Sequence, residues 1–335
     1  MSSGTASWPV PTAELAEVLQ DLLASSLGSS VPIVDLRRSV SAYSSSFPLE
    51  ELTVRLGDGR SLELVFKNLS PAAMLGEARV ARPELAYDPR HEIHAYRDVL
   101  RGAGLGTARC FGALSDDRSG WHWLFLERVP GLQLKHVGEM ATWEAAARWL
   151  ALCHTRLANH SCGAGAGSAC LSRYDAGYYW KCLERARMFS GDTLDVVADR
   201  YPAVVACLLD LPQTVIHGEF YASNVLVQQG NAGLRLCPVD WEAVGTGPGL
   251  LDVAALASGS WSNDERAGLV EAYVAAMSLS GKWPLDADAT MAGVLCCRLH
   301  LAIRWLGWAP WWSPPNDHTN DWLREALHLA DALDV

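Results

Sequence analysis

The sequence lacks the segments that direct a protein into or across a membrane. Its first fifteen residues, MSSGTASWPVPTAEL, contain neither a basic stretch nor a long apolar run, so they do not have the pattern of a secretory signal. No uncharged apolar run reaches the roughly eighteen residues of a membrane-spanning helix. These two absences predict a cytoplasmic protein that has no membrane partner.

The chain also lacks paired cysteines and an excess of basic residues. Its nine cysteines are scattered and contain no C-x-x-C pair, so neither a zinc site nor a disulfide framework is indicated, and buried thiols are expected. The net charge is −11 and the isoelectric point about 5.3. This charge argues against a nucleic-acid partner bound through a basic surface. The sequence leaves the oligomeric state open.

The residues before position 130 predict a small sheet accompanied by helices. Half of the 335 residues are hydrophobic, and the length is typical of two lobes rather than of one core. Alternation over residues 52–66, interrupted by Asp58-Gly59, predicts a β-hairpin. Helices are predicted at 12–27 and 89–100, and two further strands at 108–114 and 121–128.

Beyond position 130, helical periodicity prevails. The exceptions are two short strands, 214–217 and 224–228, predicted to form a hairpin around a polar loop, and a third strand that ends in PVDW. We therefore expect an N-terminal nucleotide-binding lobe over residues 1–129 and a C-terminal catalytic lobe over residues 130–335. The hinge between them is expected at Glu127 to Gly131.

The polar loop between the two short strands carries the chemistry. The segment VIHGEFYASNVLV, residues 215–227, places His217, Glu219 and Asn224 within eight residues, and Asp240 follows at the end of the third strand. Phosphoryl transfer from a nucleotide needs a carboxylate that orients and deprotonates the attacking hydroxyl. It also needs oxygen ligands that hold Mg²⁺ against the phosphates. Glu219 suits the first task, and Asn224 and Asp240 suit the second.

Residues of the N-terminal part suit the phosphates of the nucleotide. Lys67 ends a predicted strand and Glu92 lies on the following helix, where an ion pair would present the ammonium group to the phosphates. Asp88 and Glu84 are alternative partners for Lys67. A serine-rich loop would cover the phosphates with hydroxyl and backbone N–H donors. Its candidate residues are Ser44, Ser45 and Ser46.

The segment HGEFYASN, followed by VDWE, resembles the aminoglycoside phosphotransferase and choline kinase family, which is related to the protein kinases. The resemblance spans most of the chain, from Lys67 to GLLDVAAL near Asp252. It implies a two-lobed, protein-kinase-like α+β fold with a small antiparallel β N-lobe and a mainly helical C-lobe. It also implies transfer of the γ-phosphate of ATP or GTP to a hydroxyl of a small-molecule acceptor, with Mg²⁺ as cofactor.

The resemblance implies a role for each matching residue of the C-terminal lobe. The base position of the family falls on Glu219. The magnesium ligands fall on Asn224 and Asp240, and Glu242, two residues further on, assists them. Asp252 matches an acid that supports the catalytic loop.

The resemblance also implies the nucleotide contacts of the N-terminal lobe. The phosphate-binding lysine of the family falls on Lys67 and its partner acid on Glu92. The hinge backbone that meets adenine falls near Leu126, Glu127 and Val129.

One residue departs from the family pattern, in which the loop usually reads H-G-D-x-x-x-x-N. Glu219 occupies the position of the aspartate, and its extra methylene displaces the carboxylate by roughly 1.5 Å if nothing compensates. A misplacement of about 1 Å lowers a rate on the order of a hundredfold. Either the loop is repositioned, the acceptor sits differently, or the activity is low. We expect the ring of His217, in the same catalytic loop, to hold the loop rather than to act as the base.

The C-terminal segment LHLAIRWLGWAPWWSPPNDHTNDWL offers a site for the acceptor. Leu299, Ile303 and Trp305 follow helical spacing and predict core packing. The loop APWWSPPND cannot all be core, and aromatic side chains beside acids suit a sugar, an amine or a flat natural product. Packing of the lobe is the equal alternative for this loop. The candidate acceptor residues are Trp308, Trp311, Trp312, Asp317, His318 and Asp321.

Three functions fit these residues. The first is a kinase for an aminoglycoside or another hydroxylated metabolite. The second is a nucleotide-binding pseudokinase that regulates or scaffolds a partner, for which the glutamate at position 219 is the main argument. The third is a protein kinase, which ranks last because no activation segment with A-P-E follows Asp240.

Overall fold

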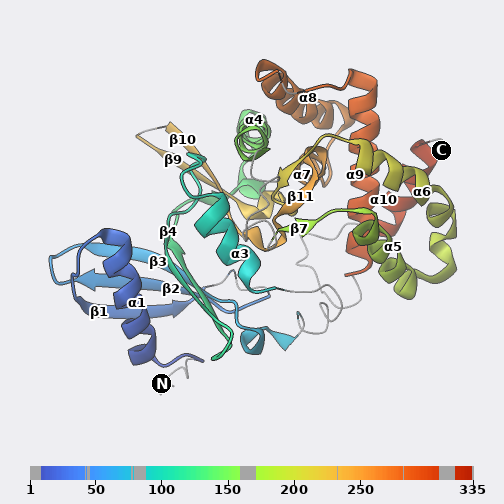
Figure 1. Cartoon of the computed structure of the whole chain (residues 1–335). Coiled ribbons are helices and arrows are strands. Elements are labelled where there is room, and N and C mark those ends of the chain that lie inside the picture. Colours follow the sequence, from blue (N-terminus) through green and yellow to red (C-terminus); the bar gives the residue numbers. More distant parts are fainter. Residues whose placement is uncertain are drawn as a thin grey trace, which may run out of the picture. The chain divides into compact units, whose positions relative to one another are not determined.

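The computed structural model divides the chain into two units (Figure 1). One comprises Met1–Ile93 and Ala108–Val129, and the other comprises His94–Thr107 and Pro130–Val335. The first is built around an antiparallel sheet and the second is mainly helical, which confirms the predicted α+β class. The structure describes residues 9–41, 43, 46–76, 78, 88–158, 171–231, 233–281, 283–308 and 321–333.

The first unit contains a five-stranded antiparallel sheet in the order β1-β2-β3-β5-β4. Alternate residues of β2, such as Leu52 and Val54, are buried in its core. The predicted hairpin over 52–66 is confirmed, because Leu52 pairs with Leu64 and Gly59 takes a positive φ of 89° in the turn. The strands are β1 (Ile33–Val40), β2 (Leu49–Leu56), β3 (Ser61–Asn68), β4 (Cys110–Asp116) and β5 (Trp121–Glu127).

Helix α1 (Thr12–Leu27) packs against this sheet (Figure 1). Its buried residues Leu15, Leu19 and Leu23 recur at helical spacing and join the core of the sheet. The helix lies close to Gly112 of β4, where an added Cβ would lie 2.7 Å from the Cβ of Leu22. The missing side chain at this position therefore sets how near the helix lies to the sheet.

The helix predicted over residues 89–100 changes type midway. Arg90–His94 form the α-helix α3, and Ala95–Val99 continue it as a π-helix. Such π-helical turns are rare and occur frequently at functional sites. Here the change coincides with the division between the two units, which falls after Ile93.

The predicted boundary near residue 130 leaves out one segment of the second unit, His94–Thr107. This segment is held by helix α4 (Met140–Leu157), because Trp149 Nε1 donates to the carbonyl of Leu105 at 2.8 Å. Arg156 of the same helix donates to the carbonyl of Ala103 at 2.9 Å. Contacts this far apart in sequence leave no local pattern, so the boundary could not be drawn from periodicity.

Helix α9 (Ala287–Leu306) is the central helix of the second unit and packs against α5, α6, α7 and α10. Among the described residues it is the one helix long and apolar enough to cross a membrane, but 61% of its apolar window is buried inside the protein. A core helix that is apolar on all sides has this pattern. The other helices are α5 (Ala176–Ser190), α6 (Asp195–Asp210), α7 (Gly249–Leu256), α8 (Asn263–Leu279) and α10 (Trp322–Ala332).

The two strands around the polar loop belong to different sheets. β8 (Gln213–Ile216) leads into the loop and pairs with β11 (Gly245–Pro248), whereas β9 (Val225–Gly230) leaves it and pairs with β10 (Gly233–Pro238). The predicted hairpin around the loop is therefore wrong, although both strands exist. The partner β11 has the sequence GTGP, which lacks the alternation that marks a strand. Two short strands complete these sheets, β6 (Leu132–Gln133) beside β9 and β7 (Ser172–Arg173) beside β11.

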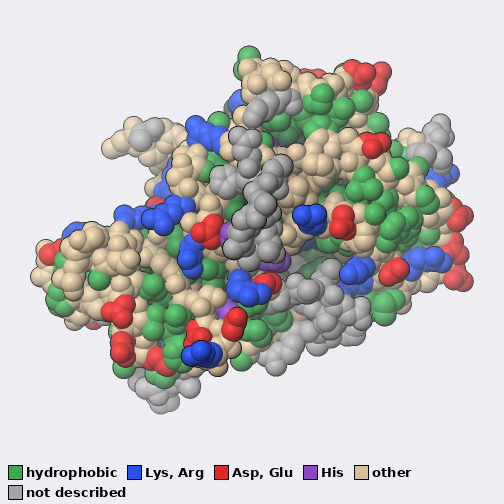
Figure 2. Space-filling model, in the orientation of Figure 1, with side chains coloured by type: hydrophobic (Ala, Val, Ile, Leu, Met, Phe, Trp, Pro, Cys, Tyr) green, Lys and Arg blue, Asp and Glu red, His purple; other side chains and the backbone are tan. Residues whose placement is uncertain are grey.

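Charged side chains of both signs are interspersed over the described surface on the face shown in Figure 2. Exposed ion pairs of the chain include Arg128 with Glu63 and Arg187 with Asp195. Exposed pairs of this kind contribute little to stability. The net negative charge therefore concerns solubility and association more than the fold.

We expect Gly112→Ala to destabilise the first unit by about 1–3 kcal/mol, because the new methyl group would press on the Cβ of Leu22. Urea unfolding measures the loss. Gly76→Ala is the matched control, since nothing lies within 4 Å of an added Cβ there. Equal stabilities of the two variants would show that α1 moves freely away from the sheet.

Candidate active site

The polar loop that follows β8 is anchored by a buried carboxylate. Asp252, near the start of α7, accepts the backbone N–H of His217 at 2.7 Å and that of Gly218 at 2.8 Å. Its carboxylate also lies 3.2 Å from Nε2 of His154, whose Nδ1 is 3.0 Å from the hydroxyl of Tyr273. Asp252 and His154 are fully buried. These contacts fix where the loop leaves β8.

The ring of His217 ties the loop to the strand that precedes Asp240. Its Nε2 lies 3.0 Å from the carbonyl oxygen of Val239, and its Nδ1 accepts the backbone N–H of Glu219 at 3.3 Å. The side chain is buried. Both ring nitrogens therefore contact backbone, which suits a ring that holds the loop and does not take a proton from a substrate.

Gly218 must be glycine for the loop to close. Its φ is +81°, and an added Cβ would lie 2.2 Å from the hydroxyl of Tyr174 and 2.5 Å from the carbonyl oxygen of Ala243. Tyr174 donates its hydroxyl to that same carbonyl at 2.7 Å. The loop and the segment after Asp240 thus meet where a side chain at position 218 would stand.

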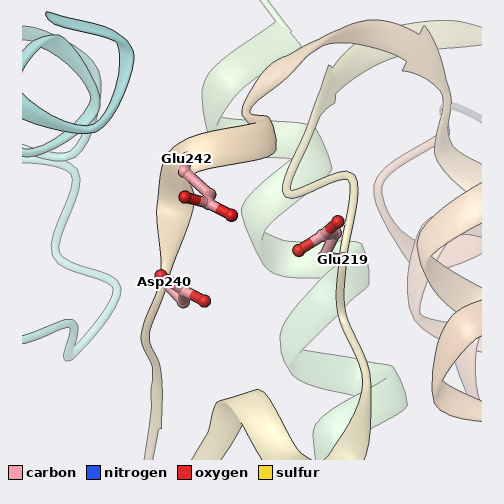
Figure 3. A group of neighbouring side chains, drawn as sticks. All are labelled: Glu219, Asp240 and Glu242. Carbon is pink, nitrogen blue, oxygen red and sulfur yellow. The ribbon is translucent and has the colours of Figure 1, made fainter. Parts of the chain in front are cut away.

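Three carboxylates converge beside this loop (Figure 3). Each of Glu219, Asp240 and Glu242 offers an oxygen within 4.8 Å of the others, and all three side chains are half-buried. Asp240 immediately precedes the 3-10 helix Trp241–Ala243, two residues after the end of β10, and Glu242 lies within that helix. Acids this close repel one another unless a cation lies among them.

Asn224 adds an uncharged oxygen to the acids. Its amide nitrogen donates to the carbonyl of Glu219 at 3.0 Å, so the side-chain oxygen Oδ1 is the atom that can bind a cation. Hard divalent cations such as Mg²⁺ are bound through carboxylate and amide oxygens. The three converging carboxylates therefore fit a divalent cation, and Asn224 offers an oxygen of the same ligand type.

Asp240 holds a backbone conformation that ordinary residues avoid. With a φ of 67° and a ψ of 59°, it is the one non-glycine residue with positive φ in the described part of the chain. Left-handed backbone costs an L-residue about 1–2 kcal/mol. Such strain gathers at functional sites, where it aims a side chain.

Arg304 is a member of the site that sequence reasoning missed. It lies in the last turn of α9, and its Nη1 donates to the carbonyl of Gly218 at 2.7 Å while its Nη2 pairs with Oε1 of Glu219. The Arg304 side chain is 11% exposed and that of Glu219 is 22% exposed. The sequence feature that points to Arg304 is that it is the single charged residue inside the apolar run LHLAIRWLGW.

The aromatic groups around Arg304 do not compete with Glu219 as proton acceptors. Burial raises the pKa of the Tyr174 and Tyr221 hydroxyls, so both stay protonated at neutral pH. On α9, burial and then the charge of Arg304 lower the pKa of His300 to about 3, which keeps that ring neutral. Of these side chains around Arg304, Glu219 is thus the one suited to orient a hydroxyl.

In the first unit, Lys67 and Glu92 form the expected ion pair. Nζ of Lys67 lies 2.7 Å from each carboxylate oxygen of Glu92, and both side chains are buried. Of the alternative partners, Asp88 pairs with Arg90 at 2.7 Å, and Glu84 lies outside the described residues. A buried ammonium held this way is suited to binding phosphate.

The remaining predicted residues occupy different places. Leu126 and Glu127 end β5, and Val129 is the last residue of the first unit. Asp321 caps α10 by accepting the N–H of Arg324 at 3.0 Å, and its role toward an acceptor stays a prediction. Ser46 and Trp308 are half-buried. Outside the described residues lie Ser44, Ser45, Trp311, Trp312, Asp317 and His318.

The strain at Asp240 can be measured by comparing two truncations. Asp240→Gly and Asp240→Ala both remove the carboxylate, but only glycine adopts positive φ freely, so we expect the alanine variant to be less stable by about 1 kcal/mol. At Glu242, which lies in an ordinary 3-10 turn, the alanine variant should instead be more stable than the glycine variant. Denaturant unfolding of the four variants gives both differences. The same order at both positions would contradict a strained backbone at Asp240.

The anchor at Asp252 can be tested without any substrate. Asp252→Asn puts an amide group where two N–H donors and His154 converge, so at least one of them loses its acceptor. We expect a loss of about 1–3 kcal/mol in unfolding free energy. Glu271→Gln on the exposed face of α8 is the control. A thermal transition of Asp252→Asn equal to the wild type would show that the loop does not depend on this carboxylate.

The chain resembles a known protein family and several solved structures. The sequence profile described as "Phosphotransferase enzyme family" matches residues 49–293. No curated protein sequence matches the chain. Among solved structures, an amicoumacin kinase in complex with AMP-PNP, Ca²⁺ and Ami superimposes with a TM-score of 0.58 at 13% identity, covering 89% of this chain and 87% of that one.

Two further structures share the fold. A spectinomycin phosphotransferase in complex with ADP and spectinomycin has a TM-score of 0.56 at 12% identity, with 98% of this chain and 99% of that chain covered. A choline/ethanolamine kinase family protein from Mesorhizobium loti has a TM-score of 0.52 at 17% identity, with 90% and 87% covered. These likenesses confirm the predicted protein-kinase-like fold. Because the family match extends over most of the length, the chain belongs to the phosphotransferase enzyme family.

Proposed function

We propose that this protein is a kinase that transfers the γ-phosphate of ATP or GTP to a hydroxyl group of a small molecule. The observation that carries the proposal is the convergence of Glu219, Asp240 and Glu242 beside the loop anchored by Asp252. Membership of a phosphotransferase family supports the reaction type. The complexes of its structural relatives with AMP-PNP and ADP support a nucleotide as the phosphate donor.

The cation site is assigned to the oxygen ligands of the second unit. Asp240, Asn224 and Glu242 would hold Mg²⁺, which would neutralise charge on the phosphates. The Ca²⁺ of the amicoumacin kinase complex supports a divalent cation. The three carboxylates, the guanidinium of Arg304 and one divalent cation together carry no net charge, so such a cation balances the site.

The donor contacts are assigned to the first unit. Lys67, oriented by Glu92, neutralises charge on the phosphates, and backbone groups from Leu126 to Val129 meet the base. The loop with Ser46 covers the phosphates. The observed ion pair between Lys67 and Glu92 supports the role of the lysine. The role of the backbone from Leu126 to Val129 rests on the family resemblance, and that of the serine loop on its hydroxyl and N–H donors.

Glu219 is assigned to the acceptor hydroxyl. Its carboxylate points into the space shared with Glu242 and Asp240 (Figure 3). From there it orients the hydroxyl and accepts its proton as the phosphoryl group is transferred. The acceptor is assigned to the aromatic segment that follows α9, beginning at Trp308.

We expect Glu219→Gln to lower kcat by about a hundredfold or more and to leave binding of Mg·ATP within about twofold, because the amide orients a hydroxyl poorly and cannot take its proton. ADP release with a panel of hydroxylated acceptors gives kcat, and calorimetry gives the nucleotide affinity. Glu184→Gln, an exposed acid on α5, is the control.

The same measurements separate the kinase from a nucleotide-binding scaffold. No contact in the described residues favours the scaffold. The ion pair of Lys67 with Glu92 and the acid group of the second unit each support the kinase. Tight binding of Mg·ATP without turnover on any acceptor, unchanged by Glu219→Gln, would overturn the kinase proposal. Absence of ATP and GTP binding would overturn both.

A further inference from the structure

The glutamate in the base position is held by a partner 85 residues away in sequence. Arg304 reaches the catalytic loop at two neighbouring points, the carbonyl oxygen of Gly218 and the carboxylate of Glu219. A guanidinium is planar and carries its donors in a rigid fork, so two contacts fix its orientation. The fork therefore holds both the backbone before Glu219 and the end of its side chain.

The position of Arg304 on a core helix makes this contact rigid. The residue lies on α9, the core helix that packs against four other helices of its unit, and the side chain is 11% exposed. Its neighbours hold their own positions: Tyr174 donates to the carbonyl of Ala243, and Tyr221 accepts from Nε1 of Trp305 at 2.8 Å. A charged side chain that extends from a packed core helix has little freedom to move with the loop.

The contact also bears on the length of the glutamate. A glutamate has one more rotatable bond than an aspartate, and this freedom must be removed before the carboxylate can orient a hydroxyl reproducibly. Repulsion from Asp240 and Glu242, both within 4.8 Å, pushes the carboxylate away from the acid cluster. The ion pair with Arg304 restricts this freedom, and its positive charge offsets part of the like-charge repulsion.

We propose that Arg304 is a positioning residue for phosphoryl transfer, which holds the carboxylate of Glu219 at the acceptor hydroxyl and so compensates for the extra methylene. The inference rests on the proposed function. Arg304 itself touches the loop and takes no part in the bond changes. Removing it should therefore lower kcat through Glu219 and leave the nucleotide contacts of Lys67 unchanged.

The chain offers a close control for a lost ion pair on the same helix. Arg298, also on α9, pairs with Glu325 of α10, and their side chains are 13% and 28% exposed, against 11% and 22% for Arg304 and Glu219. Arg298→Met removes a comparable pair away from the loop. It should lower the unfolding temperature about as much as Arg304→Met and leave kcat within about twofold.

The first measurement needs no acceptor. Unfolding temperatures of Arg304→Met, Glu219→Gln and the double variant give the coupling between the two side chains. We expect Arg304→Met to cost several degrees in the wild-type background and clearly less when Glu219 is already glutamine. Equal shifts in both backgrounds would overturn the inference, because Arg304 would then act independently of Glu219.

The second measurement follows ADP release, with water as the acceptor and with any active acceptor of the panel. Arg304→Met should lower kcat about 10- to 100-fold, keep the affinity for Mg·ATP within about twofold, and have little further effect on Glu219→Gln. Arg304→Lys, which retains the charge but not the fork, should fall between the wild type and Arg304→Met.

Two outcomes would overturn the inference and spare the kinase proposal: a kcat of Arg304→Met equal to that of Arg298→Met, or an equal loss in both Glu219 backgrounds. Failure of the wild type to bind or turn over nucleotide would instead overturn the proposed function, whatever the unfolding cycle gives.

Discussion

The buried carboxylate of Asp252 is the group on which the geometry of the site depends. By accepting the N–H groups of His217 and Gly218, it sets the direction in which the chain leaves β8. A carboxylate that accepts two backbone donors in a buried place is expensive to replace, since each donor would otherwise lack a partner. His154 extends this support into α4, so the loop rests on the helical core.

Short hydrogen-bonded contacts connect this anchored loop to the rest of the site. His217 joins the loop to Val239, and this contact brings Glu219 near Asp240. Glycine at 218 lets the two segments meet without a side chain between them. The site therefore contains three neighbouring carboxylates and a strained backbone at Asp240. Both features lower the stability of the fold. Local choices that lower stability are expected where a ligand compensates for them.

Some of this could be predicted from local pattern and some could not. The β2–β3 hairpin follows from alternation and an Asp-Gly turn, and the ion pair of Lys67 with Glu92 follows from a strand end and the next helix. The hairpin around the catalytic loop was wrong because pairing depends on the partner strand, and β11 has no strand pattern of its own. Arg304 was missed because the apolar spacing of α9 predicts only a core helix. It does not predict what a single charged residue on that helix contacts.

The sequence by itself determined the kinds of groups present: a loop with an acid and an amide, a pair of acids after the two strands that follow it, and a lysine with its glutamate. Residue type and short spacing are local properties, and they were enough to indicate phosphoryl transfer. Only the tertiary structure decided how Glu219 is held. Its partner Arg304 comes from a helix far along the chain, and such a contact exists only once α9 has packed in the core.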